Sequence, residues 1–512
     1  MNNVIYTKIK NVTHNTFVFF VLIYASYSLF LNQTYDPDNT ASIVNGYYSN
    51  IMWSKIVQNN LLGGRVVSTF ESVCNFLFNK IGINFLSNRF VLQLLLMVLL
   101  SCACAELLQL YATYYIYGKK WLYPIIAFGV ISPFYVEFFA FGGMGGGLGF
   151  LLSVISVVYY SKGKYFSALL WCFLAVGTYQ VNYQIVILYG IAVLFYEYED
   201  NIARILKKVI YLFAISGISA IFVLVAPRLF SMISGQKEVK ESIIGAAERT
   251  PFLLQIFYVY REYINVLKHN YGLMPVYFLG LLVFILIALS LICLAYAKDK
   301  KKIVLFALFT IIIWLLPPSF AIVMATIYMP SRTLIGIFMA LSVQMLMAYK
   351  CVCVCISDRK VLFYFFQGIV LIYAFVVLYS VQTMAADVLI TNKMEMAQMR
   401  MMQNIIDEYE DETGNIVDTV AVTHLKNGIY AYDKSNTNMN YMGYPSTHMV
   451  INKEWCDVVF LNYVNGKNYK RADIPEEDVE RFFPDLNWED FDTFNPTKQM
   501  VFEGNVLYWA QY

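Results

Sequence analysis

The sequence predicts an α-helical polytopic membrane protein with about 11 spans and a small α+β domain at its C-terminal end. Of its 512 residues, 59% are hydrophobic and 14% are charged, whereas globular proteins carry about 25% charged residues. Residues 384–512 contain 21 Asp and Glu against 10 Lys and Arg, a net charge of −11, so residues 1–383 carry +13. We therefore expect two units, a basic membrane domain at 1–383 and an acidic soluble domain at 384–512.

The basic residues predict which face of the membrane each loop occupies. Apolar runs that reach roughly 20 residues can cross about 30 Å of hydrocarbon, and no cleavage site follows the first run. The Lys and Arg clusters between the runs fall on one face, which is cytoplasmic by the positive-inside rule, so the N-terminus is expected inside and the C-terminal domain outside. The eleven predicted spans lie near 15–32, 90–116, 121–140, 148–161, 165–180, 182–197, 207–227, 274–297, 303–325, 334–356 and 361–383.

Residues 33–89 form the predicted first outer loop. Val66–Ile81 is apolar enough to suggest a further span, but polar residues occupy one of its helical faces and it is shorter than a span needs. We expect this stretch and residues 40–56 to form two amphipathic helices that lie on the membrane surface. The loop begins with YDPDNT, in which Asp36 and Asp38 flank Pro37.

These motifs resemble those of the bacterial glucosyltransferase II family, which modifies O-antigen, and more broadly the GT-C glycosyltransferases. In that fold the first external loop carries an essential acidic residue and two juxtamembrane helices. This chain departs from the family pattern in the run GGMGGGLG at 142–149, which leaves Glu137 as the nearest substitute for a second carboxylate. The matching residues here are Asp36 and Asp38, Trp53, Gly64-Arg65, SPFYVEFF at 132–139 and GTYQVNYQ at 177–184.

The resemblance implies an inverting transferase that moves a sugar, glucose by analogy, from a polyprenyl phosphate onto a lipid-linked glycan. The reaction would occur at the outer face of the bacterial inner membrane. The implied partners are the sugar donor, the glycan acceptor and membrane lipid, with no nucleic acid. No cofactor is implied, and a divalent metal stays open because GT-C enzymes of both kinds exist. The alternative is a polysaccharide polymerase or flippase of the same pathway, which would use basic outer loops without an outer carboxylate.

Asp36, Asp38 and Glu137 are the candidate catalytic residues. Glycosyl transfer from a lipid phosphate needs a base for the acceptor hydroxyl and donors or cations for the departing phosphate. A carboxylate near the interface becomes a better base when desolvation raises its pKa. Either Asp36 or Asp38 could serve, although YDPDNT could instead be a turn and helix cap. Glu137 lies within a predicted span, where an acid is costly and marks a functional site by default.

Outward-facing Arg and polar side chains are the candidates for binding phosphate and sugar. Arg65 follows two glycines and Arg332 lies in the turn TIYMPSR; a guanidinium matches phosphate oxygens well, and the alternative is snorkelling to lipid headgroups. Tyr179 and Gln180 lie in a polar break between apolar runs, which either lines a sugar cavity or is a simple loop. Arg261 lies among aromatic residues that either stack on sugars or form an interfacial belt.

The remaining patterns predict no metal site and assign a supporting role to the tail. The glycine run at 142–149 lacks the Lys of a phosphate-binding loop and predicts either a flexible outer loop or close helix packing. In the tail, residues 384–412 and IPEEDVERFF predict helices, whereas VDTVAVTHL, WCDVVFLNYV and QMVFEGNVLYWAQY predict strands. We expect this domain to recognise the acceptor or to cover the active site.

Overall fold

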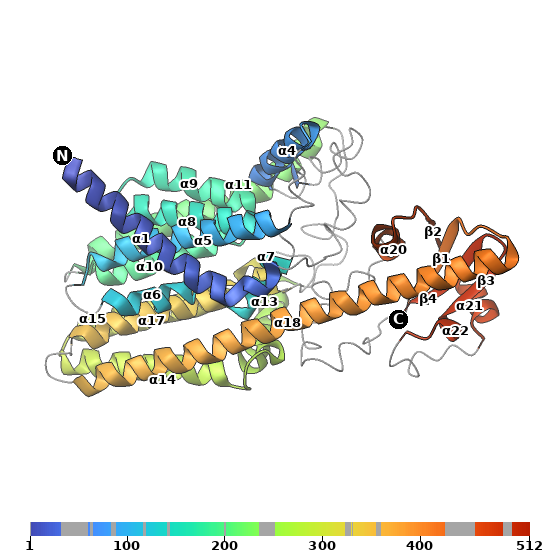
Figure 1. Cartoon of the computed structure of the whole chain (residues 1–512). Coiled ribbons are helices and arrows are strands. Elements are labelled where there is room, and N and C mark those ends of the chain that lie inside the picture. Colours follow the sequence, from blue (N-terminus) through green and yellow to red (C-terminus); the bar gives the residue numbers. More distant parts are fainter. Residues whose placement is uncertain are drawn as a thin grey trace.

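The computed structural model consists of a helical bundle and a small sheet domain, joined by the long helix α18 (Figure 1). It describes residues 2–31, 60–61, 65–82, 89–115, 119–140, 144–198, 201–234, 251–322, 329, 331–354, 360–424, 456–484 and 494–511. The main bundle helices are α1 (Asn2–Tyr27), α4 (Val66–Lys80), α5 (Arg89–Ala112), α6 (Leu122–Ala127), α7 (Val136–Ala140), α8 (Met144–Ser161), α9 (Tyr165–Thr178), α10 (Asn182–Tyr196), α11 (Ile202–Ser234), α13 (Phe252–His269), α14 (Phe278–Tyr296), α15 (Lys300–Leu315), α16 (Ser319–Ile322), α17 (Gly336–Val354) and α18 (Lys360–Thr413).

Six helices in the described ranges are long and apolar enough to cross a membrane, namely α1, α5, α11, α14, α17 and α18. Large apolar side chains point outward along several of them, for example Phe284 on α14 and Phe375 on α18, which are 69% and 73% exposed. Soluble proteins rarely expose contiguous apolar surface of this kind. The class predicted from the sequence, a helical membrane protein with a small C-terminal domain that contains a sheet, therefore agrees with the structure.

Two helices occupy the centre of the bundle. In α10 every residue except Tyr183 is buried, and 83% of the apolar window of α17 is buried against 28% for α1, α11 and α18. A helix that is apolar on all sides has to be surrounded by other helices or by lipid. The α10–α17 pair is therefore the core on which the peripheral helices pack.

The glycine run predicted either a flexible loop or close packing, and its described part, from Met144 onward, is the beginning of α8. A Cβ placed on Gly149 would lie 1.9 Å from the side-chain nitrogen of Asn182, and one on Gly146 would lie 2.5 Å from the Phe138 ring. Asn182 in turn donates to the Ala175 carbonyl at 2.9 Å. The glycines thus let α8 approach the turn between α9 and α10, as small residues do between membrane helices.

The Lys-bearing helix termini gather at one end of the bundle, here called the basic end. Lys350 lies 5.3 Å from the Tyr196 ring and Lys302 lies 5.6 Å from the Phe195 ring. Lys208 forms an ion pair with Glu197. These contacts join the termini of α10, α11, α15 and α17. The opposite end is called the domain end, because α18 leaves the bundle there toward the C-terminal domain (Figure 1).

Helix α18 crosses the predicted boundary at residue 383 without a break. Its residues up to Val388 belong to the core of the bundle, whereas Met399, Met402 and Ile406 belong to the core of the C-terminal domain. The helix predicted at 384–412 is therefore the distal half of α18. One continuous helix therefore connects the bundle to the C-terminal domain.

The C-terminal domain is a four-stranded sheet of order β2-β1-β4-β3, with β1 parallel to both β2 and β4 and with β3 antiparallel to β4. Val420 and Val422 of β1 face α18, while Ala421 faces the opposite side with Ile474 and Phe483. The strands and short helices are β1 (Thr419–His424), α20 (Asp457–Asn465), β2 (Lys470–Asp473), α21 (Glu476–Phe482), α22 (Pro496–Gln499), β3 (Met500–Glu503) and β4 (Val506–Gln511).

The prediction of a strand at WCDVVFLNYV is wrong, because this stretch forms α20. Val458 and Leu461 are buried one helical turn apart, and the Asn465 side chain donates to the Met399 carbonyl of α18 at 3.0 Å. Gly466 ends the helix with a φ of 65°, a conformation that favours glycine. Packing on α18 outweighs the strand preference of the Val and Phe residues.

One buried carboxylate ties β1, β2 and α20 together. Asp457 is fully buried, and the Arg471 Nε lies 3.0 Å from both of its oxygens. The His424 Nε2 lies 2.9 Å from Asp457 Oδ2. Arg471 also bonds Asp473, whose side chain is 77% exposed. Because a buried charge without a partner is costly, this cluster fixes α20 on the sheet.

We expect Gly149→Ala to destabilise the bundle by about 1–3 kcal/mol, because the added methyl group overpacks a filled site and displaces the Asn182 side chain. Gly280→Ala is the matched control, since a Cβ there meets no atom within 4 Å and alanine favours a helix. Thermal unfolding of the purified protein in detergent measures both variants. Equal unfolding midpoints would contradict the close packing of α8.

We expect Asp457→Ala to cost the C-terminal domain about 3–5 kcal/mol, because it strips Arg471 of its buried partner. Asp473→Ala removes an exposed partner of the same arginine and should cost less than about 1 kcal/mol. Proteolysis of the full-length protein at increasing urea concentrations reports the opening of the domain. A similar urea midpoint for the two variants would show that the buried cluster does not stabilise the domain.

Candidate functional site

The predicted span at 121–140 is broken, and the break forms the base of a polar site at the domain end. After α6 the chain turns, and Ser132 caps the short 3-10 helix at Pro133–Tyr135 by accepting from the Tyr135 N–H at 3.2 Å. Serine as N-cap followed by proline is a favourable helix start. Helix α7 follows directly and carries Glu137 in its first turn.

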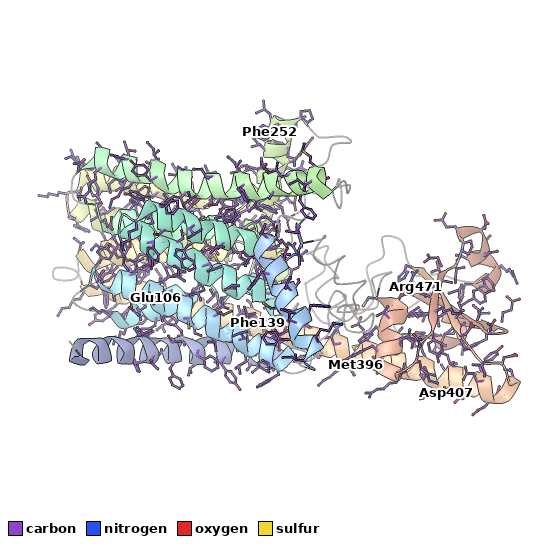
Figure 2. All side chains as sticks on the ribbon, turned by 90° about the horizontal axis from the view of Figure 1, so that it is seen from above. Glu106, Phe139, Phe252, Met396, Asp407 and Arg471 are labelled. Atoms are coloured by element: carbon purple, nitrogen blue, oxygen red, sulfur yellow. The ribbon has the colours of Figure 1, made fainter. Side chains whose placement is uncertain are left out.

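Helices α1 and α5 hold α7 in place. The Tyr27 hydroxyl of α1 donates to the Val130 carbonyl at 2.7 Å and accepts from the Ser132 N–H at 2.9 Å, so it satisfies backbone groups freed by the break. The Tyr27 ring stacks on Phe139 with centroids 4.0 Å apart. Gln93 of α5 donates to the Phe139 carbonyl at 3.1 Å. Figure 2 places Phe139 at the end of the bundle nearest the C-terminal domain, and Glu106 farther from it.

Glu137 and Arg332 form an ion pair across 195 residues of sequence. Glu137 is 1% exposed, whereas the Arg332 side chain is 25% exposed. One carboxylate oxygen accepts from the Arg332 guanidinium, and the other accepts from the Arg332 backbone N–H at 2.8 Å. The carboxylate therefore fixes both the backbone and the side chain of Arg332.

Tyr179 lies against this pair. Its hydroxyl lies near the Arg332 guanidinium, and its ring meets the Phe138 ring edge-on at 5.6 Å. The Arg65 guanidinium lies over the face of the Tyr179 ring, 5.5 Å from its centroid. Both guanidiniums are thus near one tyrosine, which places two positive charges on one side of the buried Glu137.

Helix α4, the second of the two predicted amphipathic helices, positions Arg65. The Ser68 hydroxyl donates to the Thr178 carbonyl at the end of α9 at 3.0 Å. The Asn60 amide donates to the Ser72 hydroxyl at 2.9 Å, which ties the preceding chain to α4. Arg65 immediately precedes α4, so the contact with Thr178 sets it over the neighbouring Tyr179.

The other predicted site residues have different positions. Gln180 follows Tyr179 at the turn into α10 and is partly buried. Arg261 lies on the exposed face of α13, with its guanidinium 5.1 Å from the Tyr258 ring, whereas Gln255, Val259, Tyr263 and Val266 form the buried face. Asp36 and Asp38 lie outside the described residues, as do the stretch 40–56, Trp53 and Gly64.

Three residues of the site were not singled out from the sequence. Phe138 supports the Tyr179 ring, Ser68 docks α4, and Thr178 receives it. Phe138 directly follows Glu137 in SPFYVEFF, so the prediction of Glu137 as a site residue could have drawn attention to Phe138 as well. Ser68 was counted only as part of the polar face of α4, and no sequence pattern pairs it with Thr178.

The arrangement suits an anionic ligand with hydroxyl groups. Arginine binds phosphate oxygens through a planar fork, and charge-assisted hydrogen bonds of this kind are about twice as strong as neutral ones. Among the described residues, no group of three or more His, Cys, Asp or Glu side chains is placed to hold a metal ion. The structure thus defines a helical membrane protein with a polar, arginine-bearing site at one end.

Comparison with known proteins does not identify a family for this helical membrane protein. No family model, no curated protein and no solved structure matches the chain. The function is therefore argued from the site itself.

A double-mutant cycle tests the coupling of the ion pair. We expect Arg332→Gln to cost about 3 kcal/mol because it removes the guanidinium that pairs with the buried Glu137, and Glu137→Gln to cost less because Arg332 is partly exposed. The double variant should be more stable than the two single effects predict by about 1–3 kcal/mol. Thermal unfolding in detergent gives all three values.

Arg261→Gln is the control for the cycle, because an exposed side chain of this kind changes stability by about 0.5 kcal/mol at most. Strictly additive effects of Glu137→Gln and Arg332→Gln would mean that the ion pair does not contribute to the folded protein.

Proposed function

We propose that this protein is an inverting, GT-C-type membrane glycosyltransferase. It transfers a sugar, glucose by analogy, from a polyprenyl phosphate to a lipid-linked glycan such as an O-antigen. The observation that supports this proposal best is the set of contacts at the domain end, where Glu137 holds Arg332 beside Tyr179 and Arg65 covers the ring of that tyrosine.

The proposal assigns the two guanidiniums to the donor phosphate. The phosphate gains negative charge as its bond to the sugar breaks, and fixed cations that face a developing charge lower the barrier. Arg332 is held by Glu137 before the ligand arrives, so little orientation entropy is lost on binding. Both Glu137 oxygens accept hydrogen bonds from Arg332, so in this mechanism Glu137 is a positioning residue and not the base.

The base in this mechanism is Asp36 or Asp38. Both ends of the segment that carries them are at the domain end. Before it, the Phe30 ring lies 6.2 Å from the Phe139 ring. After it, Asn60 bonds α4. Asp36 is the fifth residue after Leu31, so it lies within about 18 Å of it.

The proposed step is a single displacement at the anomeric carbon. The acceptor hydroxyl oxygen attacks this carbon, the bond from the carbon to the phosphate oxygen breaks, and the hydroxyl proton passes to the aspartate. Polyprenyl phosphate leaves with its charge offset by Arg332 and Arg65. Tyr179 and Gln180 line the sugar side, and the C-terminal domain recognises the glycan acceptor or covers the site.

The proposed topology places the basic end in the cytoplasm, following the positive-inside rule. In this arrangement five further segments cross the membrane in addition to the six long apolar helices, for about 11 spans in total. They are the shorter helices α8, α9, α10 and α15 and the broken α6–α7 segment. The N-terminus is then cytoplasmic, and the candidate site and the C-terminal domain lie outside the bacterial inner membrane. This puts the site where lipid-linked donor and acceptor meet.

The test is transfer from labelled polyprenyl-phosphate glucose to a lipid-linked glycan by the purified protein. We expect the variant with both Asp36→Asn and Asp38→Asn to lose transfer by at least about 100-fold, because it lacks a general base. Arg332→Ala should lose a similar factor, with Arg332→Lys intermediate. Arg204→Ala, an exposed change at the basic end, should retain full activity.

Transfer that persists in the double aspartate variant would overturn the base assignment. Lengthening of the glycan by whole repeat units, without transfer of single sugars, would overturn the transferase assignment in favour of a polymerase.

A further inference from the structure

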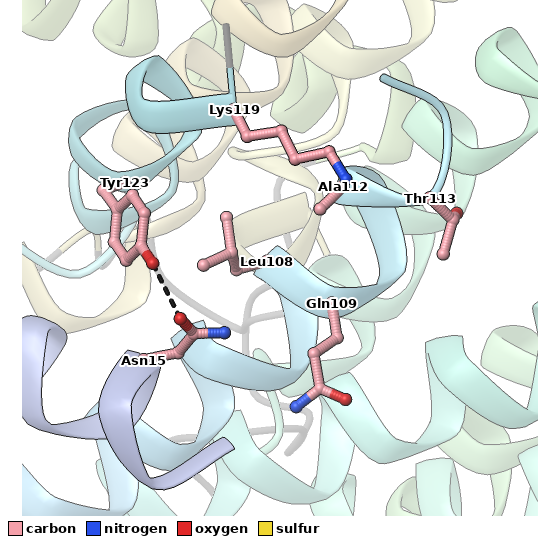
Figure 3. A pocket seen from close by; sticks show the side chains of 7 residues that line it. All are labelled: Asn15, Leu108, Gln109, Ala112, Thr113, Lys119 and Tyr123. Carbon is pink, nitrogen blue, oxygen red and sulfur yellow. Dashed lines mark hydrogen bonds between the residues drawn. The ribbon is translucent and has the colours of Figure 1, made fainter. Parts of the chain in front are cut away.

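A separate pocket lies at the basic end, between α1, α5 and the start of α6. Its volume is about 440 Å³. It is remote from Glu137 and plays no part in the proposed transfer. Figure 3 shows the residues that line it, which are Asn15, Leu108, Gln109, Ala112, Thr113, Lys119 and Tyr123.

The pocket presents hydrogen-bond donors and one cation. The Tyr123 hydroxyl donates to the Asn15 side-chain oxygen at 2.7 Å, which leaves the Asn15 amide hydrogens to donate elsewhere (Figure 3). The Gln109 amide nitrogen is buried, and no hydrogen-bond acceptor for it is present in the described part of the chain. Lys119 supplies the positive charge.

None of the described residues that line the pocket is acidic. The nearest carboxylate on the same helix, that of Glu106, lies about one turn farther from the basic end and does not line the pocket. Because buried donors in proteins nearly always have an acceptor, the lining is complementary to an anion. Its volume accommodates a phosphate group with a short polar substituent.

The surroundings of the pocket are apolar. Leu108 and Ala112 form part of its wall. On α1 the exposed Phe17, Val21 and Tyr24 lie on the helical face opposite Asn15, so the apolar surface beside the pocket belongs to α5. On α5 the residues Leu95 and Val98 are exposed, and Gln109 and Thr113 continue the same helical face toward the basic end. A ligand with its charge in the pocket therefore has apolar surface available beside it.

We propose that this pocket binds the phosphodiester headgroup of an anionic phospholipid. Lys119 and the amides of Gln109 and Asn15 contact the phosphate oxygens, and the acyl chains lie along the exposed face of α5. Basic pockets between spanning helices at the cytoplasmic face bind anionic lipids in this manner. The lipid then bridges α1, α5 and α6, which already meet at the Tyr123–Asn15 hydrogen bond.

Native mass spectrometry of the full-length protein with phosphatidylglycerol tests this proposal, with the zwitterionic phosphatidylcholine, which has no net charge, as the comparison. We expect phosphatidylglycerol to remain bound at detergent concentrations that remove phosphatidylcholine. Lys119→Ala should weaken its binding about 5- to 10-fold, and Gln109→Leu should weaken it as well. Lys119→Arg should restore binding, which separates loss of the charge from misfolding.

Lys120→Ala is the matched control, because this adjacent lysine is exposed, as Lys119 is, but does not line the pocket. Equal weakening by Lys120→Ala would overturn the pocket in favour of general attraction to a basic surface. Soluble glycerol phosphate distinguishes a lipid from a free phosphate. If it displaces phosphatidylglycerol at equal concentration, the ligand is a soluble phosphate and the lipid assignment is wrong. Because the readout is lipid binding, loss of glycosyl transfer does not affect it.

Discussion

Hydrocarbon offers no partner to a backbone N–H or C=O group, and this constraint organises the bundle. Unbroken helices satisfy the groups internally. Where a helix breaks, neighbouring side chains take over. Tyr27 of α1 accepts from the Ser132 N–H and donates to the Val130 carbonyl at the break before α7. Asn182 serves the Ala175 carbonyl at the turn between α9 and α10. Tyr27 and Asn182 therefore close gaps in the helical hydrogen bonding of their neighbours.

The same constraint explains where the candidate site lies. A break in a helix can reorient the chain and bring an acid to the end of the bundle, but a buried acid needs a cation. Arg332 meets that need through both its guanidinium and its backbone N–H. Holding Glu137 in this way also holds Arg332 at a fixed place beside Tyr179. The single interaction between Glu137 and Arg332 thus neutralises the buried carboxylate and also fixes the arginine in place for a ligand.

Helix α18 continues from the bundle into the C-terminal domain. Its proximal part packs in the bundle and its distal part, through Met399 and Met402, is one wall of the C-terminal core. The parallel strands β1 and β4 end at His424 and Gln511, which pair with each other. The C-terminus, directly after β4, lies on the side of the domain that faces the bundle (Figure 1). The carboxyl edge of the sheet and the candidate site therefore face the same space.

Much of this architecture could be predicted from local patterns. The apolar runs and the amphipathic stripe of α4 each depend on neighbouring residues, and the structure has helices at both. The acidic stretch that the charge count marked contains the small sheet. Strand prediction failed at WCDVVFLNYV because α20 is set by packing on α18, which local propensity does not encode. The glycine run was ambiguous because a glycine that allows flexibility and one that allows contact look alike in sequence. The partner, here Asn182 for Gly149, decides between them.

The sequence by itself determined that this chain is a membrane protein with an acidic C-terminal domain, because burial in lipid and net charge follow from composition. It also marked Glu137 as unusual, since an acid is costly within a span, and it singled out Arg332, Arg65 and Tyr179 as candidates for binding phosphate and sugar. Only the tertiary structure decided that these four meet and that Arg261 lies on the exposed face of its own helix. Contacts across 195 residues of sequence depend on how the helices pack, and helix packing is a property of the assembled bundle.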